Sequence, residues 1–197
     1  MTPPTFDPAR TAVLAMDCQA AIVSVYVKPP EPFLERAVSV LAAARRAKMT
    51  VIHVQVGFRP GLPEINARHG IFGAIKSDPQ RQKLFEGPGG AVHPALGPEP
   101  GDLVVTKRRV SAFTGSDLEV LLRANEIDTM VMFGIATSGV VLSTLLQAVD
   151  ADYRTIIVGD CCVDNDADLH AALVERFFPK RGAVITAREF AEAAESR

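Results

Sequence analysis

Short, almost uninterrupted runs of Val, Ile and Leu recur along this 197-residue chain, and they limit the folds that it can adopt. Because the runs are continuous rather than alternating, they predict strands buried on both faces, as in a parallel sheet that is covered by helices. The predicted strands are residues 11–16, 50–56, 102–106, 128–133, 154–158 and 183–186.

Helical patterns lie between most of these strands. Residues 32–48 and 116–125 each place apolar side chains on one face, and a similar pattern follows residue 140. Residues 168–178 predict another helix, which stops at Pro179. Alternation of strands and helices with right-handed crossovers predicts one α/β domain over residues 1–197, a doubly wound three-layer α/β/α fold with a six-stranded parallel sheet.

The stretch at about residues 58–101 departs from this alternation. It holds half of the prolines, more than half of the glycines and only one short helical pattern, near residues 72–76. A connection of this length inside a compact domain is typical of a lid or binding loop. A plain surface excursion or an oligomer contact fits the same composition.

Composition restricts the partners and the compartment. A net charge of −2 without a Lys/Arg run argues against nucleic acid, and no apolar stretch reaches the roughly 20 residues that cross a bilayer. The start, MTPPTFDPAR, lacks the apolar block of a secretory signal. The odd cysteine count, with Cys161 next to Cys162 and Cys18 apart, argues against a disulfide framework. We therefore expect a cytoplasmic protein with a small-molecule partner and neither nucleic acid nor membrane.

Charged side chains follow two of the predicted strands directly. Asp17 comes after the first strand and Lys107 after the third, and the carboxyl ends of parallel strands meet at the edge where such sheets bind ligands. A partly desolvated carboxylate suits proton transfer, and a nearby lysine can polarise a substrate oxygen. A structural ion pair that fixes the loops is the other interpretation of the same two residues.

The fourth strand runs into a turn of small residues, FGIATSGVVLST, over residues 133–144. Thr137 or Ser138 can cap the helix that follows, and the free amides at its start can hold an oxyanion or carboxylate. An ordinary strand-to-helix turn is equally compatible with this composition. No GxGxxG or GxxxxGK[ST] motif marks the turn as a phosphate site.

Four segments together resemble the isochorismatase-like cysteine hydrolases: AMDCQ, VVTKRRVSAF, GIATSGVVLST and IIVGDCC, in that order. The resemblance runs from about residue 11 to residue 186 and implies a six-stranded parallel sheet between helices. It also implies a triad of Asp, Lys and Cys. The first two members fall on Asp17, with Gln19 keeping the D-x-Q context, and on Lys107, ahead of Ser111 and Phe113.

The third member of that triad is missing. In the family's G-x-x-T-x-x-C-V pattern, Gly134, Thr137 and Val141 match, but Val140 occupies the cysteine position. The resemblance places an unusual cis peptide between Ala136 and Thr137, and an anion cradle on the amides of Thr137 and Val140. Amidases of the family need a thiolate, whereas its isochorismatases hydrolyse a vinyl ether without one.

These observations predict a hydrolase of a small organic acid, ether or amide, with Asp17 and Lys107 as catalytic residues. The predicted substrate-binding residues are Ala136, Thr137, Gly139, Val140, Phe58, Arg59, Phe72 and Arg109. A catalytically silent binding protein is the alternative, and a third interpretation restores catalysis through Cys162 or Cys18. We expect no cofactor and no metal, since the region after the second strand offers Glu64 and His69 without the family's D-x-H. The resemblance also implies a homo-oligomer.

Overall fold

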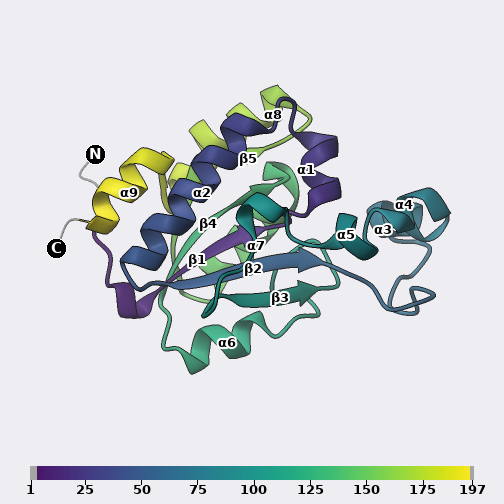
Figure 1. Ribbon diagram of the computed structural model, residues 1–197, viewed down its shortest axis with the longest axis horizontal. Helices are drawn as coiled ribbons and strands as arrows, with labels where there is room; N and C mark the ends of the chain where they lie inside the picture. Colours follow the sequence, from purple (N-terminus) through teal and green to yellow (C-terminus); the bar gives the residue numbers. More distant parts are fainter. Residues whose placement is uncertain (1–3, 196–197) are drawn as a thin grey trace.

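A six-stranded sheet forms the centre of the protein, whose computed structural model describes residues 4–195 (Figure 1). The strand order is β3-β2-β1-β4-β5-β6, and every neighbouring pair is parallel. The order reverses beside β1, which lies between β2 and β4. The predicted doubly wound parallel sheet is therefore confirmed. Its strands are β1 Thr11–Met16, β2 Thr50–Val56, β3 Leu103–Lys107, β4 Thr129–Ile135, β5 Arg154–Val163 and β6 Ala183–Ile185.

Strand β5 extends five residues beyond its predicted end at residue 158. The apolar run of β5 breaks at Gly159 and Asp160, but the strand continues to Val163. It continues because its pairing with β4 shifts register between Met132 and Gly134, so that Gly134 pairs with Cys162. The Asp160 carboxylate is only partly buried, and it accepts a hydrogen bond from the Ala187 amide at 2.8 Å.

Helices cover both faces of the sheet (Figure 1). Helix α2, Glu31–Arg46, carries Glu31 in its first turn and two arginines in its last turn, which complements the helix dipole. Its apolar stripe is buried, and it packs beside α9, Ala187–Glu195. Helix α6, Leu118–Ala124, connects β3 to β4 on the opposite face (Figure 1).

The remaining helices are shorter. Helix α1 is Ala20–Tyr26, α7 is Leu142–Asp150 and α8 is Ala167–Ala172. The helix predicted at 168–178 is helical throughout but changes type, from α8 to a π-helical turn, η4, Leu173–Phe177, and then to a 3-10 turn, η5, Phe178–Lys180. Two further 3-10 turns are η1, Pro8–Arg10, and η2, Pro94–Leu96, and a π-helical turn, η3, spans Thr137–Val141.

The Pro/Gly-rich excursion folds into short helices beyond the carboxyl ends of β2 and β3 (Figure 1). These are α3 Gly70–Lys76, α4 Pro79–Lys83 and α5 Gly87–Gly90. A small apolar cluster, separate from the main core, joins them to the sheet through Val56, Leu62, Ile65, Phe72 and Ile75. Over residues 4–195, no helix combines the length and the apolar character that a membrane crossing needs.

Candidate active site

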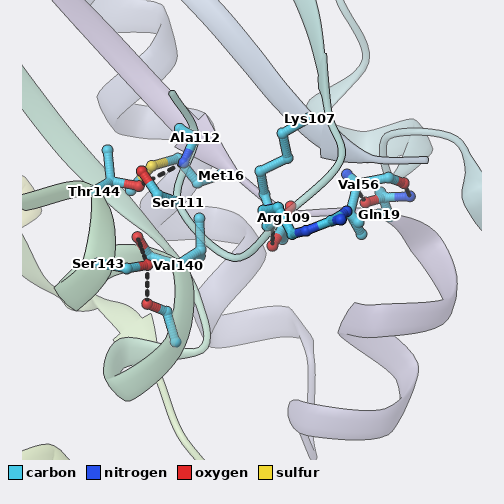
Figure 2. A network of polar contacts seen from close by, with 12 residues as sticks. Met16, Gln19, Val56, Lys107, Arg109, Ser111, Ala112, Val140, Ser143 and Thr144 are labelled. Carbon is cyan, nitrogen blue, oxygen red and sulfur yellow. Dashed lines mark hydrogen bonds and ion pairs between the residues drawn. The ribbon is translucent and has the colours of Figure 1, made fainter. Parts of the chain in front are cut away.

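Asp17 and Lys107 form an ion pair at the carboxyl edge of the sheet. Asp17 follows β1 with a positive φ of 54°, and Lys107 ends β3, two strands away. The Lys107 Nζ lies 2.9 Å from Asp17 Oδ2. It also donates a hydrogen bond to the carbonyl of Arg109 at 2.9 Å, and Figure 2 shows Lys107 and Arg109 side by side. The structure thus brings together the two charged residues that the sequence places at the ends of separate strands.

This ion pair is almost completely buried, with 2% of Lys107 and 7% of Asp17 exposed. Burial raises the pKa of the Asp17 carboxyl, and the neighbouring Lys107 ammonium opposes that increase only in part. The second carboxyl oxygen, Oδ1, is buried and has no hydrogen-bond partner among the described residues. A carboxyl group in this state can exchange a proton with a bound molecule that meets Oδ1.

The turn after β4 lies against this ion pair because Gly134 permits a close approach. Gly134 has a φ of +147°, and a Cβ there would lie 2.0 Å from the Met16 carbonyl oxygen. A cis peptide follows between Ile135 and Ala136. The position expected from the family resemblance, between Ala136 and Thr137, is therefore wrong by one residue.

Asp164, directly after β5, and His170 of α8 hold the turn in place. The Asp164 carboxylate accepts hydrogen bonds from the Ser138 amide and hydroxyl, both at 2.7 Å. His170 Nδ1 lies 2.8 Å from the Thr137 hydroxyl. Neither Thr137 nor Ser138 caps the following helix, contrary to one interpretation of the sequence, because Asp164 and His170 engage both hydroxyls.

Most amides of the turn already have partners. The amides of Gly139 and Val141 donate to the Ala136 carbonyl, and the Ser138 amide donates to Asp164. The Ser143 hydroxyl, one turn later, donates to the Gly139 carbonyl at 2.7 Å. These contacts fix the backbone of the turn without using the Val140 side chain.

A cavity of about 350 Å³ opens above Asp17 and Lys107, a volume within the range of small-molecule sites. The turn contributes Ala136, Gly139 and Val140 to its wall. Among the described residues that line it, the side chains able to carry charge or donate a hydrogen bond are Asp17, Lys107, Arg81 and Tyr26. The other lining residues are apolar: Ala21, Ile22, Val25, Val56, Ile71, Phe72, Ile75, Leu84, Phe85, Val110 and Ile135.

The Pro/Gly-rich excursion supplies one wall of the cavity, from Ile71 to Phe85. Gln19 fixes this segment, because its buried side-chain amide donates to the Gly90 carbonyl and makes two hydrogen bonds with Val56 (Figure 2). An isolated bridge between Gln19 and Val92 adds to this anchorage. The segment therefore closes over the end of β1 and belongs to the site.

The substrate-binding residues expected from the sequence divide into two groups. Phe72, Ala136, Gly139 and Val140 line the cavity, whereas Thr137 is fully buried and does not line it. Phe58 and Arg59 line a second hollow of about 240 Å³, which shares Phe85 with the cavity. The Arg109 guanidinium is bound to the carbonyls of Arg108 and Glu64 and does not line the cavity.

The sequence patterns do not point to several polar residues of the site, among them Arg81, Tyr26 and Asp164. The first two lie in segments without a clear strand or helix pattern. The sequence gives no signal for Asp164 because the apolar run of β5 ends at residue 158, five residues before the strand itself does. Any carboxylate after a longer β5 would have been a candidate for this edge of the sheet.

The three thiols lie outside the cavity. Cys18, Cys161 and Cys162 are all buried, and burial raises the pKa of each, that of Cys162 to about 12. Thiolate formation near neutral pH is thereby suppressed, and with it nucleophilic reactivity. Cys18 follows Asp17, but its thiol points to the Met16 carbonyl at 3.6 Å.

The histidines are engaged in local contacts. His69 and His93 accept hydrogen bonds from the amides of Phe72 and Ala95, and His53 Nε2 lies 3.0 Å from Asp102 Oδ2. Burial lowers the pKa of His53, and the Asp102 carboxylate opposes that decrease. Between residues 4 and 195, His, Cys, Asp and Glu side chains do not gather in groups of three or more that could hold a metal ion.

Known proteins share both this sequence pattern and this fold. The Isochorismatase domain family matches residues 11–189. The maleamate amidohydrolase of Pseudomonas putida is 32% identical over 157 residues, which span 79% of this chain and 71% of that enzyme. A ureidoacrylate amidohydrolase of Methylorubrum extorquens is 31% identical over 177 residues, 80% of this chain and 71% of that enzyme.

A solved structure agrees with these matches. An isochorismatase family protein from Burkholderia thailandensis superposes with a TM-score of 0.84 at 31% identity, covering 99% of this chain and 100% of that one. The family match covers most of the chain, and the shared six-stranded parallel architecture accounts for the superposition. The chain therefore belongs to the isochorismatase-like hydrolase family.

Proposed function

We propose that this protein hydrolyses a small organic acid, ether or amide through Asp17, without a covalent enzyme intermediate. The observation that carries this proposal is the buried Asp17–Lys107 ion pair, 2.9 Å long, at an apolar cavity that Asp17 lines, with Asp17 Oδ1 lacking a hydrogen-bond partner among the described residues. Asp17 acts as the general acid and base, and Lys107 holds its carboxyl in position. The amides of Thr137 and Val140 stabilise negative charge on the substrate.

The residues that line the cavity favour an ether over an amide within this range. Val140 cannot attack a carbonyl carbon, and the buried thiols lie elsewhere. A vinyl ether needs no protein nucleophile, because Asp17 gives a proton to the double bond and water adds to the resulting cation. The added water returns a proton to Asp17, and the adduct breaks down to a carbonyl compound and an alcohol.

The names of two relatives suggest which amides to test as substrates, in addition to vinyl ethers. Maleamate and ureidoacrylate are the compounds that two relatives act on by name. Turnover of these amides and of vinyl ethers of small acids can be followed by NMR with the full chain. Intact-mass spectrometry of the same reactions should show no acylated protein.

Asp17→Asn tests the role of the carboxyl. Loss of general acid–base catalysis should reduce turnover by about 10²–10⁴-fold. Asp150→Asn, an exposed residue at the end of α7, is the matched control and should leave turnover unchanged. Unchanged turnover in a folded Asp17→Asn variant would contradict the proposal.

A catalytically silent binding protein is the second candidate, and the absence of a nucleophile at Val140 favours it. Such a protein would bind small carboxylates at equilibrium and leave them intact over a long incubation. The same NMR samples distinguish the two candidates, since binding without product formation supports the silent protein.

A further inference from the structure

We propose that the cavity selects amphipathic carboxylates, with Arg81 as the residue that binds the carboxylate and the apolar rim as the surface for the rest of the molecule. This inference rests on the proposed function for the identity of the site. It extends that proposal by naming the chemical class of the ligand and a residue that determines specificity.

The cations that line the cavity differ in their freedom to bind an anion. Among the described lining residues, the cations are Lys107 and Arg81. Lys107 is buried and neutralised by Asp17 at 2.9 Å, so it has little capacity left for a second anion. Arg81 is 57% exposed, and only its Nε is paired, at 3.3 Å from Asp78 Oδ2. Both of its Nη groups remain without a hydrogen bond to any described residue, and a guanidinium edge of this kind binds a carboxylate with two parallel bonds.

The rim around Arg81 is apolar. Val25, Ile71 and Leu84 line the cavity and are 49%, 60% and 39% exposed, values that are high for large apolar side chains. They come from α1, from α3 and from the segment after α4. Exposed apolar side chains that converge on one cavity mark a surface that a ligand covers. A ligand that satisfies both features has an apolar body and one anionic end.

The volume of the cavity fits a compact molecule. Its volume of about 350 Å³ equals the liquid volume of roughly a dozen water molecules. A molecule of this size can rest its apolar body on Phe72 and Leu84 and present its other end to Asp17. Arg81 therefore fixes which end of the ligand stays at the mouth and which end enters.

Binding of cinnamate and of its neutral isostere cinnamamide to the full chain tests this assignment by calorimetry. Wild-type protein should bind the acid more tightly than the amide. Arg81→Met should weaken cinnamate binding by about three- to tenfold and leave cinnamamide binding unchanged. Arg81→Lys should give an intermediate result, because lysine keeps the charge but loses the bidentate geometry.

Two further variants test whether any change in cinnamate binding comes from the contact between Arg81 and the ligand carboxylate. Arg188→Met removes an arginine that is also paired within its helix, but on α9, and should not alter binding. Asp78→Asn removes the carboxylate beside Arg81 and keeps a side chain that can cap α4, so cinnamate should bind about two- to threefold more tightly.

Ile71→Ser examines the apolar rim in the same way. It should weaken acid and amide alike by about threefold, the value of roughly one buried methylene group. Val120→Ser is its control, since Val120 is equally exposed on α6 and does not line the cavity. The proposal is overturned if wild-type protein fails to bind cinnamate, or if Arg81→Met binds the acid as tightly as wild type does. Both measurements are of binding, so they stand or fall independently of the turnover that tests Asp17.

Discussion

Replacing Lys107 by methionine isolates the energetic role of the buried ion pair. Methionine preserves much of the side-chain stem but removes the ammonium that lies 2.9 Å from Asp17 Oδ2 and 2.9 Å from the Arg109 carbonyl. Because 2% of Lys107 and 7% of Asp17 are exposed, the remaining carboxylate has almost no access to water. Breaking a pair buried to this extent costs about 3–5 kcal/mol in the free energy of unfolding at neutral pH.

The destabilisation caused by Lys107→Met should increase as pH rises. Burial raises the pKa of Asp17 in the folded state above its unfolded value, so the folded chain binds this proton more tightly. Its contribution to stability is present at low pH and is lost as pH rises through the folded pKa. Without Lys107 the folded pKa rises further, so the penalty of Lys107→Met should grow from pH 5 to pH 8 by up to about 1.4 kcal/mol per pH unit.

Urea unfolding of four proteins at pH 5, 6.5 and 8 measures both effects: wild type, Lys107→Met, Asp17→Asn and the double variant. The double variant removes both charges, so its cost should fall below the sum of the single costs by about 2 kcal/mol or more. A Lys107→Met penalty below about 1 kcal/mol, or one that does not change with pH, would refute the buried ion pair. Differences between variants cancel the titration of other carboxylates.

Three other changes examine the turn after β4. Gly134→Ala should destabilise the protein by about 3 kcal/mol or more in thermal unfolding, because its Cβ meets the Met16 carbonyl oxygen, whereas Gly70→Ala, with open space around it, should be nearly neutral. Asp164→Ala removes two charge-assisted hydrogen bonds to Ser138 and should cost about 2–4 kcal/mol in urea unfolding at pH 7. Burial opposes the hydrogen bonds from Ser138, but these bonds prevail and lower the pKa of Asp164. The loss of unfolding free energy in Asp164→Ala should therefore shrink as pH falls below about 4. A loss that stays constant with pH contradicts this role. Val140→Cys should yield acylated protein with maleamate in intact-mass spectra, and a lack of any adduct would show that the turn cannot support a nucleophile.

The sheet was predictable because burial on both faces makes each strand a continuous apolar run. Strands β1 and β2 begin and end at the predicted residues. Helix α1 could not be predicted from the sequence, because AAIVSVY is rich in β-branched residues and has no side-chain cap. Helix α9 carried a usable signal: Thr186 and Glu189 form a capping box, with reciprocal hydrogen bonds of 2.7 and 3.2 Å.

The site was predictable only where strand ends define it. Asp17 and Lys107 follow buried runs, and parallel strands bring such residues to one edge. Arg81 lies in a segment whose short helices are held by an apolar cluster and by Gln19, and these contacts connect residues distant in the sequence. Asp164 depends on the register shift of β5 against β4, which no local pattern encodes.

The contacts that hold the turn after β4 do not depend on the side chain at position 140. Gly134 allows the backbone to approach β1, Asp164 holds Ser138, and His170 lies at the Thr137 hydroxyl. None of these contacts involves the side chain at position 140, which is 2% exposed and lines the cavity. The valine side chain offers no nucleophile, and the contacts that hold the turn do not depend on it. The proposed function therefore places the reactive group of this site on Asp17, in the ion pair with Lys107.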